Sequence, residues 1–312
     1  MSLGVARFFL RHSLLAVFVM VGMSAVLHSQ SATPVRPKIT GVDHVAILVS
    51  SQADAQQFYV KLLGYSRVAL SGDAAYSYAV NPAQSIETIT GPPKRGSRID
   101  HVAFATSDAE ALRGYLSAKG VKVPAKCGEA FGGGLEFAVT DPEGNPVEFV
   151  QRSGQAAAPS TSDRVPISKH LIHAGIIVHN PAVEDGFYRD ILGFHLYWKG
   201  GMQEEKTDWV SMQVPDGTDW IEYMLNIGPD ATAELRGVMN HIALGVKDIQ
   251  AVNAALRSTG WKPTEREHPQ LGRDGKWQLN LYDSDLTRTE LMEFRPVSQP
   301  CCSPYTGEHP SR

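Results

Sequence analysis

The sequence predicts an α+β fold in which four βαβββ modules form two tandem domains with concave mixed sheets. The main observation is an internal repeat. Phe58–Tyr65 (FYVKLLGY) recurs as Phe187–Phe194 (FYRDILGF), 129 residues further along, and His44 and His173 have the same separation. Repetition at a fixed spacing indicates a structural unit that has been copied. Each copy divides again into two similar halves, which gives four modules.

Every module is expected to begin with a buried strand and to continue into a helix. The first strands are expected at Val42–Val49, Ile99–Thr106, Leu171–Val178 and Met239–Val246. Residues that commonly cap helices follow these strands: Ser51, Ser107, Asn180 and Asp248. Ser107 and Glu110 also have the spacing of a capping box. The four helices are expected to end at glycines, the residues that favour a left-handed C-terminal backbone: Gly64, Gly120, Gly193 and Gly260.

The chain of 312 residues is long enough for two domains of ordinary size. Domain 1 is expected at residues 40–151 (copy one) and domain 2 at residues 169–296 (copy two). Residues 152–168 are rich in Ala, Ser, Pro and Gln and are expected to form a linker. Residues 297–312 are expected to be a disordered or surface-hugging tail.

The charge distribution argues against a nucleic-acid partner. The formal net charge is −4, and no Lys/Arg cluster extends beyond Lys94-Arg95. Proteins that bind nucleic acid usually carry a basic patch or stripe. We therefore expect no nucleic-acid partner; a monomer and a homodimer are both open.

The N-terminus has the pattern of an export signal at residues 1–31. Arg7 and Arg11 precede an apolar run of 15 residues at 13–27, and small residues follow at Ser29 and Ser31. The run is short for a helix that spans a bilayer. We expect a cleaved signal peptide and a periplasmic or secreted protein, with an uncleaved N-terminal membrane anchor as the alternative and no other membrane association.

The three cysteines cannot form a disulfide framework. Cys301 and Cys302 are adjacent in the Pro-rich tail, where a vicinal disulfide or a metal site is conceivable. We favour the interpretation that they are tail thiols without a catalytic role.

Each of the four first strands carries a histidine with a small residue two positions later. Residues two apart on a strand share one face, so the histidine face is shallow while the opposite face is bulky and can pack under a helix. This pattern is typical of the floor of a concave site. The histidines and their small neighbours are His44 with Ala46, His101 with Ala103, His173 with Gly175 and His241 with Ala243.

Glutamates occupy corresponding strands later in each module. A turn that begins at Asp141 precedes Glu148, and a turn of the same length that begins at Asp283 precedes Glu290. Glu290, and not Glu293, is therefore the counterpart of Glu148. The first half of each copy offers Glu87 and Glu222.

With these residues in place, the sequence resembles the vicinal oxygen chelate superfamily (glyoxalases, bleomycin resistance proteins and dioxygenases), and within it the glyoxalase I branch. The resemblance covers 40–151 and 169–296. It implies a divalent metal ion (Zn, Ni, Co, Mn or Fe) held by one His and one Glu from each module. The implied ligands are His44, Glu87, His101 and Glu148 in copy one and His173, Glu222, His241 and Glu290 in copy two. Whether a site forms within a copy or between facing modules of the two copies stays open.

The resemblance implies a glyoxalase-like lyase or isomerase that acts on a small substrate with vicinal oxo or hydroxy groups. A ligand glutamate that leaves the metal would serve as the base, with Glu290, Glu222 and Glu148 as the catalytic candidates and Glu87 as the partner of Glu148. An extradiol-type ring-cleaving dioxygenase is the alternative. Its signature has a tyrosine three residues before the aspartate of the turn, and this position holds Ala138 in copy one and Asn280 in copy two, which counts against it.

A ligand-sequestering protein without catalytic activity is the third possibility. All five tryptophans lie in copy two, and most of them are expected to serve ordinary packing. Trp220 shares a strand face with Glu222 and is the candidate for a substrate pocket. Arg288 shares a face with Glu290 and is the candidate for holding a substrate carboxylate.

Overall fold

The computed structural model describes residue 1 and residues 35–154, 164–228 and 230–311. The predicted signal peptide therefore lies outside the described residues apart from its first residue, and so does most of the predicted linker. Within the described ranges, no helix is both long and apolar enough to cross a lipid bilayer.

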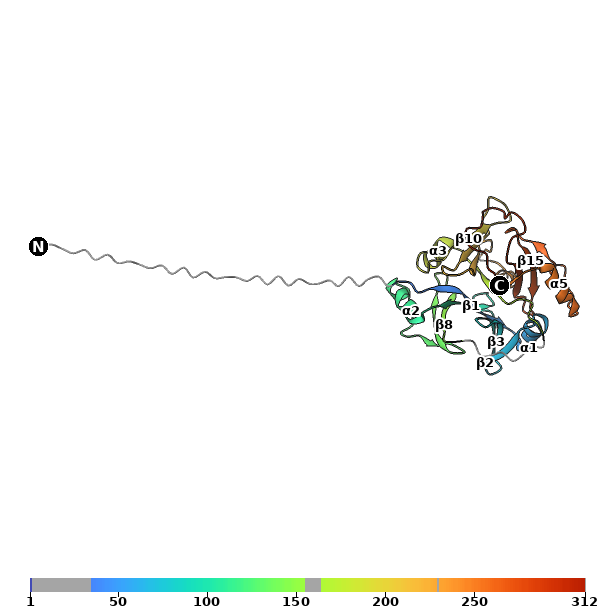
Figure 1. Ribbon diagram of the computed structural model, residues 1–312, viewed down its shortest axis with the longest axis horizontal. Helices are drawn as coiled ribbons and strands as arrows, with labels where there is room; N and C mark the ends of the chain where they lie inside the picture. The colour runs from blue at the N-terminus through green and yellow to red at the C-terminus, as the bar shows by residue number, and fades with distance from the viewer. Residues whose placement is uncertain (2–34, 155–163, 229, 312) are drawn as a thin grey trace. The chain divides into compact units, whose positions relative to one another are not determined.

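Copy one forms one curled mixed sheet with the strand order β2-β3-β4-β1-β5-β8-β7-β6 (Figure 1). The central pair β1 and β5 is antiparallel, and each of these strands has a parallel neighbour on its other side, β4 and β8 respectively. The elements are β1 (Ile39–Val49), α1 (Gln52–Gln56), the π-helix η1 (Gln57–Leu62), β2 (Ser66–Ser71), β3 (Ala75–Asn81), β4 (Gln84–Thr90), β5 (Ile99–Thr106), α2 (Ala109–Ala118), β6 (Gly128–Glu129), β7 (Gly134–Thr140) and β8 (Pro146–Arg152).

Copy two forms a second sheet with the equivalent order β10-β11-β12-β9-β13-β16-β15-β14. This identity of topology confirms the predicted fold class of two tandem domains built from four related modules. The elements are β9 (Leu171–Ile177), α3 (Pro181–Tyr188), β10 (His195–Gly200), β11 (Trp209–Gln213), β12 (Trp220–Met224), α4 (Ala233–Met239), β13 (His241–Val246), α5 (Ile249–Ser258), β14 (Gln270–Leu271), β15 (Trp277–Tyr282) and β16 (Arg288–Glu293).

The helix starts follow the predicted caps in three of four modules. The side chains of Ser51, Asn180 and Asp248 accept hydrogen bonds from backbone N–H groups in the first turn. The prediction of Ser107 as a cap was wrong, because Asp108 caps α2 by accepting from the N–H of Ala111. A carboxylate one residue later reaches the same free N–H groups and also favours the positive end of the helix dipole.

All four predicted glycines adopt a left-handed backbone, but only Gly64, Gly120 and Gly260 directly follow a helix C-cap; α3 already ends at Tyr188, five residues before Gly193. Their φ angles are 84° at Gly64, 83° at Gly120, 81° at Gly193 and 87° at Gly260. This left-handed backbone is strained for residues with a Cβ atom, and it turns the chain back toward the next strand.

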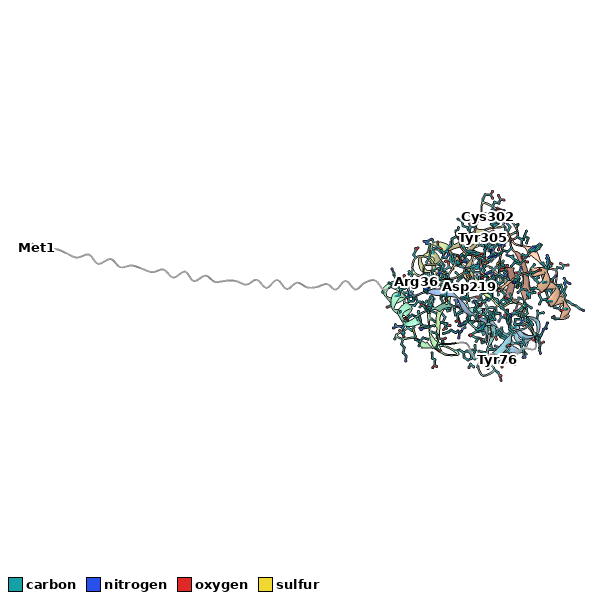
Figure 2. The ribbon with its side chains drawn as sticks, viewed as in Figure 1. Met1, Arg36, Tyr76, Asp219, Cys302 and Tyr305 are labelled. Atoms are coloured by element: carbon teal, nitrogen blue, oxygen red, sulfur yellow. A yellow bond between two sulfur atoms is a disulfide. The ribbon has the colours of Figure 1, made fainter. Side chains whose placement is uncertain are left out.

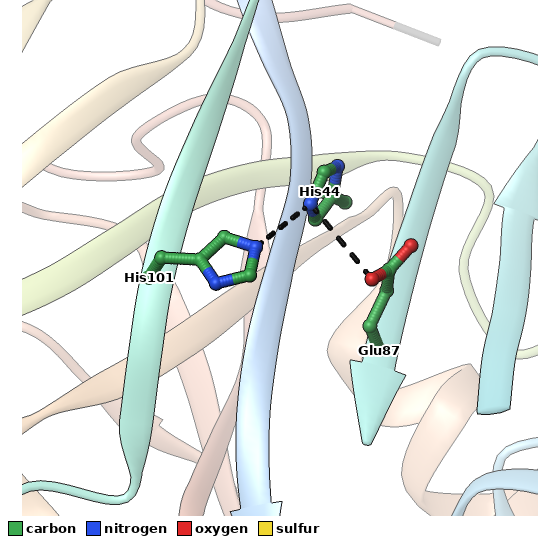
Figure 3. A group of neighbouring side chains, drawn as sticks. All are labelled: His44, Glu87 and His101. Atoms are coloured by element: carbon green, nitrogen blue, oxygen red, sulfur yellow. Dashed lines mark hydrogen bonds and ion pairs between the residues drawn. The ribbon is translucent and has the colours of Figure 1, made fainter. Parts of the chain in front are cut away.

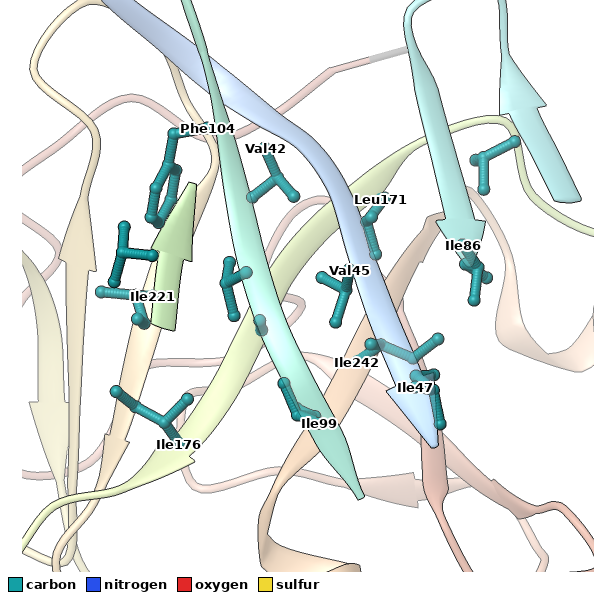
Figure 4. Packing of buried hydrophobic residues seen from close by; sticks show 14 of the residues in the cluster. Val42, Val45, Ile47, Ile86, Ile99, Phe104, Leu171, Ile176, Ile221 and Ile242 are labelled. Atoms are coloured by element: carbon teal, nitrogen blue, oxygen red, sulfur yellow. The ribbon is translucent and has the colours of Figure 1, made fainter. Parts of the chain in front are cut away.

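The bulky faces of the first strands pack into one hydrophobic core that both copies share (Figure 4). Val45 and Ile86 from copy one and Leu171, Ile221 and Ile242 from copy two are fully buried in it. Each such side chain contributes about 1.5–3 kcal/mol by leaving water. The histidine faces of both sheets are thereby left on the outside of this core.

Polar contacts between the copies repeat with approximate twofold symmetry. The hydroxyl of Tyr59 donates to Asp283 of copy two at 3.4 Å, and the hydroxyl of Tyr188 donates to Asp141 of copy one at 3.3 Å. Asp219 adds a contact outside this symmetry: its carboxylate accepts from the N–H of Val42 at 3.0 Å and meets the His170 ring at 2.7 Å (Figure 2). These buried bonds fix how the two sheets are joined.

The tail packs on copy two. The indole N–H of Trp198 donates to the carbonyl of Cys301 at 3.2 Å, and the hydroxyl of Tyr305 donates to the carbonyl of Asp274 at 2.8 Å (Figure 2). Cys301 and Cys302 form a vicinal disulfide, so the favoured interpretation of separate tail thiols was wrong.

Candidate metal centres

The predicted ligands of copy one lie on four adjacent strands, β4, β1, β5 and β8, and their side chains converge on the concave face. Figure 3 shows His44, Glu87 and His101 pointing toward one another. The Nε2 atoms of His44 and His101 are 3.0 Å apart. The nearest oxygen of Glu148 lies 3.4 Å from His44 Nε2 and 3.2 Å from His101 Nε2, and Glu87 lies 3.9 Å from His44 Nε2.

Carboxylates support both histidine rings of copy one from behind. Asp43 accepts from Nδ1 of His44 at 2.8 Å and is itself held by two hydrogen bonds from Arg152, at 2.9 and 2.5 Å. Asp100 accepts from Nδ1 of His101 at 3.0 Å and is held by Lys94 at 2.6 Å. A carboxylate on Nδ1 fixes the tautomer that offers the Nε2 lone pair to a metal.

Charged neighbours determine the protonation states of His44 and Glu148 in copy one. Burial opposes a charge on the rings, but Glu87, Asp43 and Glu148 outweigh it and raise the pKa of His44 to about 10. Burial also opposes ionisation of Glu148, yet the two imidazoles outweigh it and lower the pKa of that carboxyl. A metal ion must therefore displace protons when it binds this site.

Copy two brings its four predicted ligands together in the same arrangement on β12, β9, β13 and β16. The Nε2 atoms of His173 and His241 are 3.0 Å apart. Glu290 lies 3.5 Å from both of these atoms, and Glu222 lies 3.5 Å from His241 and 3.9 Å from His173. Glu293 faces the other side of the sheet, where it accepts from the N–H of Ile249.

Burial and the surroundings of the rings distinguish copy two from copy one. His173 and His241 are fully buried, and the ring of His173 stacks on Trp220 with centroids 4.6 Å apart. Nδ1 of His173 has no hydrogen-bond partner among the described residues. Among the described residues, no carboxylate supports the His241 ring from behind; its Nδ1 faces the carbonyl of Met239 at 2.8 Å and the guanidinium of Arg288 at 2.7 Å.

The pKa values of the two glutamates of copy two are shifted in opposite directions. Burial and the charge of Glu290 raise the pKa of Glu222 to about 8. Burial opposes ionisation of Glu290 as well, but its contact with His241 and the charge of Arg288 outweigh burial and lower its pKa. Such a difference in pKa between paired carboxyl groups is typical of sites where one holds a proton and the other stays ionised.

A cavity of about 340 Å³ opens beside the copy-two ligands. Both carboxylates of the set, Glu222 and Glu290, form part of its wall. The predicted pocket residues Trp220 and Arg288 line it too, together with Trp198, Trp209, Tyr197 and Tyr305. Trp261 and Trp277 pack against the main hydrophobic core, and Trp198 and Trp209 pack in smaller hydrophobic clusters while also lining the cavity, so the packing expectation holds for all four.

The cavities described beside the copy-one ligands are much smaller. The cavity that touches Glu87 measures about 40 Å³, and the one that touches His101 about 10 Å³. The positions that carry Trp220 and Asn280 in copy two hold Ser85 and Ala138 in copy one, at the same register against the histidine and glutamate strands.

A fully buried lysine stands behind the cavity wall. Lys276 donates to the hydroxyl of Tyr197 at 3.0 Å, and its ammonium lies about 5 Å from the ring centroids of Tyr197, Trp220 and Tyr305. Burial lowers its pKa to about 8. The tail therefore completes an aromatic cage for a cation, and through Tyr305 it also completes the cavity.

Both ligand sets form within a copy, which answers the question that the sequence left open. Sequence reasoning missed Asp43, Asp100 and Lys276. The first two precede ligand histidines directly, so a signal was present. Strict alternation along a strand would have put them on the opposite face, but the register of β1 is irregular between Val42 and His44.

Comparison with known protein families gives a match that covers both copies. Residues 41–149 and 170–285 each match the profile described as Glyoxalase/Bleomycin resistance protein/Dioxygenase superfamily. No curated protein sequence matches the chain.

Solved structures share the fold at low sequence identity. Homoprotocatechuate 2,3-dioxygenase from Arthrobacter globiformis is similar with a TM-score of 0.63 and 20% identity, over 84% of this chain and 81% of the other. A variant of the Brevibacterium fuscum enzyme of the same name gives 0.63 and 20%, over 89% and 75%. The Mn(II)-bound glyoxalase from Novosphingobium aromaticivorans gives 0.63 and 18%, over 82% and 83%.

Proposed function

The chain belongs to the Glyoxalase/Bleomycin resistance protein/Dioxygenase superfamily, and on this premise we propose that copy two is the active site of a metal-dependent lyase or isomerase of the glyoxalase type. Its substrate is a small molecule with vicinal oxo or hydroxy groups. The observation that carries the proposal is the cavity of about 340 Å³ whose wall includes both Glu222 and Glu290. A substrate in this cavity reaches the ligand set directly.

The residues present fit a divalent metal ion. His173, His241, Glu222 and Glu290 would hold it, because two imidazoles and two carboxylates suit Zn, Ni, Co, Mn or Fe. When bound, such an ion polarises a carbonyl or hydroxyl oxygen of the substrate as a Lewis acid.

Glu222 is the candidate general base. Burial and Glu290 raise its pKa to about 8 in the metal-free site, so a Glu222 carboxylate that leaves the metal would be a stronger base than an ordinary glutamate. The hydroxyl of Ser211 donates to the other oxygen of this carboxylate at 3.3 Å and so orients it. Glu290 keeps a lowered pKa and stays ionised through the reaction.

The aromatic wall orients the substrate and limits water. Trp198 and Trp220 are almost fully buried, and together with Trp209 and Tyr305 they line the space beside the carboxylates. Flat apolar walls with a few polar groups are typical of small-molecule sites.

An extradiol-type dioxygenase is the second candidate. Ligand atoms of His173, His241 and Glu290 lie within 4.8 Å of one another, and two histidines with one carboxylate are the set that holds Fe(II) in ring-cleaving enzymes. The structural neighbours include enzymes named as dioxygenases. Asn280, which lies opposite Glu290, stands where that subfamily has a different residue, and it weighs against this candidate.

Glu222 distinguishes the two reactions. In the lyase or isomerase, proton transfer by Glu222 is essential. In the dioxygenase, Glu222 takes no part in the reaction. We would assay the wild type and Glu222→Gln for deuterium incorporation into α-hydroxy ketones in D₂O with Zn²⁺, Ni²⁺ or Mn²⁺, and for oxygen uptake with catechols and Fe(II). Exchange that the variant loses supports the lyase or isomerase, and oxygen uptake that the variant keeps supports the dioxygenase.

Metal content tests the shared premise. Residues 32–312 would be expressed without a tag, and metal per chain would be counted by mass spectrometry beside His241→Ala and His101→Ala. Loss of one ion in His241→Ala is the expected result. Protein that takes up no Zn, Ni, Co, Mn or anaerobic Fe(II) would refute both enzymatic functions and leave a ligand-sequestering role.

We further propose that the protein is exported, on the strength of the N-terminal sequence pattern. The vicinal disulfide is in keeping with an oxidising compartment. N-terminal sequencing of protein recovered from outside the cytoplasm tests this: a start near residue 32 supports cleavage, and a start at residue 1 supports the membrane anchor.

A further inference from the structure

Nδ1 of His241 has two neighbours that require opposite protonation states of this nitrogen. The carbonyl of Met239, at 2.8 Å, can only accept a hydrogen bond, so it requires a proton on Nδ1. The guanidinium of Arg288, at 2.7 Å, can only donate, so it requires a lone pair on Nδ1. A neutral ring satisfies one of the two at a time. The choice between them sets which ring nitrogen carries the proton.

The other side of the ring links this choice to metal binding. Nε2 of His241 lies 3.0 Å from Nε2 of His173, and a hydrogen bond there needs a proton on one of the two atoms. A metal ion held by both rings needs both Nε2 lone pairs. When Arg288 occupies Nδ1 of His241, the proton of the neutral ring is on Nε2, and that nitrogen is blocked.

The Arg288 contact is the stronger of the two. A hydrogen bond from a charged donor contributes about 1.5–3 kcal/mol, against about 0.5–1.5 kcal/mol for a neutral bond to a backbone carbonyl. The fully buried ring sharpens this difference, because water cannot replace either partner. The contact with Arg288 therefore favours the form of His241 that cannot bind a metal.

Copy one lacks this conflict, which makes it an internal reference. Nδ1 of His44 and of His101 each faces a carboxylate, Asp43 and Asp100, and both require the metal-binding tautomer. The position that corresponds to Arg288, two residues before the ligand glutamate, is Pro146, which carries no donor.

The guanidinium of Arg288 has an alternative binding position, in the cavity. Its side chain lines the cavity, and its Nε atom has no hydrogen-bond partner among the described residues although it is buried. An anionic group in the cavity would receive two parallel N–H donors from the guanidinium, a geometry that matches a carboxylate. The rest of the wall is aromatic, so a carboxylate on a flat, apolar body fits the space.

We propose that Arg288 is an anion-sensitive latch: it holds His241 in the tautomer that cannot bind a metal, and a carboxylate ligand in the cavity draws it away. The His241 proton then lies on Nδ1 and bonds to the carbonyl of Met239, and Nε2 becomes free. No proton enters or leaves the ring; it changes nitrogen. By linkage, the carboxylate strengthens metal binding and the metal strengthens carboxylate binding by the same factor.

This inference rests on the proposed function in one respect, that copy two binds a metal. The test uses the full chain with copy one disabled (His44→Ala, His101→Ala) and Zn²⁺ as the probe. Arg288→Lys keeps the positive charge but shortens the side chain and loses the planar donor, and Arg288→Met removes both. We expect both variants to bind Zn²⁺ on the order of tenfold more tightly than the parent.

The variants separate the latch from simple charge repulsion. If charge alone weakened metal binding, Arg288→Met would bind more tightly and Arg288→Lys would match the parent, which would overturn the latch. Equal affinity in all three proteins would also overturn it while leaving the proposed function intact. Absence of Zn²⁺ binding in all three would refute the metal site itself.

Nitrogen NMR reads the tautomer without any metal. With ¹⁵N-labelled histidine, and with the His241 signal assigned by its loss in His241→Gln, we expect the Nε2–H form in the parent and the Nδ1–H form in Arg288→Lys. The Nδ1–H form in both proteins would overturn the latch.

Benzoate and its neutral counterpart benzamide test the anion. We expect benzoate, and not benzamide, to tighten Zn²⁺ binding in the parent by a factor near that of the variants, and to have no such effect in Arg288→Met. A Zn²⁺ affinity that neither benzoate nor acetate changes would overturn the coupling to anions, whatever the variants do.

Discussion

Gly175 is the residue on which the position of the His241 ring depends. A Cβ atom at this glycine would lie 2.0 Å from Cε1, 2.2 Å from Nδ1 and 2.9 Å from Nε2 of His241. Carbon atoms in contact are normally about 3.5–4.0 Å apart, so Gly175→Ala must push the ring by about 1.5 Å. The ring is fully buried and has no space to rotate freely. We expect the copy-two site to lose its geometry.

The size of the effect follows from what a metal tolerates. Metal–nitrogen distances in protein sites vary by about 0.2 Å, and disturbing residues that orient a ligand histidine typically costs about 10–100-fold in affinity. Displacing the ligand itself by more than 1 Å should cost at least the upper end of that range. The crowding should also destabilise the fold by about 1–3 kcal/mol.

The assay is metal content after exhaustive buffer exchange, with thermal unfolding to check the fold. If the wild type holds two ions, Gly175→Ala should keep the copy-one ion and lose the other. Gly186→Ala is the matched control, because nothing lies within 4 Å of a Cβ atom there. A folded Gly175→Ala protein that binds copy-two metal as tightly as the wild type would show that the ring does not lie against Gly175, and the geometric reasoning would fail.

Three further predictions concern stability. Burial and Asp141 raise the pKa of Glu184 to about 8, so the folded state holds this proton more tightly than the unfolded chain. The contribution of Glu184 to stability is therefore full below about pH 4.5 and is lost as pH rises through about 8, on the order of a few kcal/mol in all. Denaturant unfolding across this range should show a decline that Glu184→Gln removes, and the same decline in the variant would assign it elsewhere. Asp219→Ala removes the partner of the Val42 N–H and of Nε2 of His170, whose Nδ1 still faces the carbonyl of Ser311, and should lower the unfolding free energy by about 2–4 kcal/mol. A loss below 0.5 kcal/mol in urea titration would contradict a structural role for this contact. Tyr305→Ala opens the cage around Lys276 and should lower the melting temperature and increase solvent access to the cavity, as tryptophan fluorescence quenching would report. Unchanged quenching would mean that the tail does not close this wall.

The repeat made most of the fold and the donor set predictable. His44, His101, His173 and His241 lie on equivalent strands, and alternation along a strand fixes which residues share their face. The equal turn lengths before Glu148 and Glu290 fixed the register of the later strands in the same way. These features depend on local periodicity, which the sequence carries directly.

The prediction failed where the outcome depended on exact side-chain reach. Ser107 and Asp108 are both good helix caps, and only the backbone path showed that Asp108 reaches the free N–H group. Cys301 and Cys302 form a vicinal disulfide, one of the alternatives that composition alone could not choose between.

The sequence by itself determined that this protein has two copies of one fold and which eight candidate ligand side chains face its concave surfaces. Only the tertiary structure decided that each site forms within a copy and that the two sites differ in what stands behind their ligands. Asp43 and Asp100 support the rings of copy one, while Arg288 opposes the metal-binding form of His241 in copy two. The physical reason is that strand periodicity is a local property, whereas a tautomer or a cavity wall is set by atoms brought within about 3 Å from distant parts of the chain.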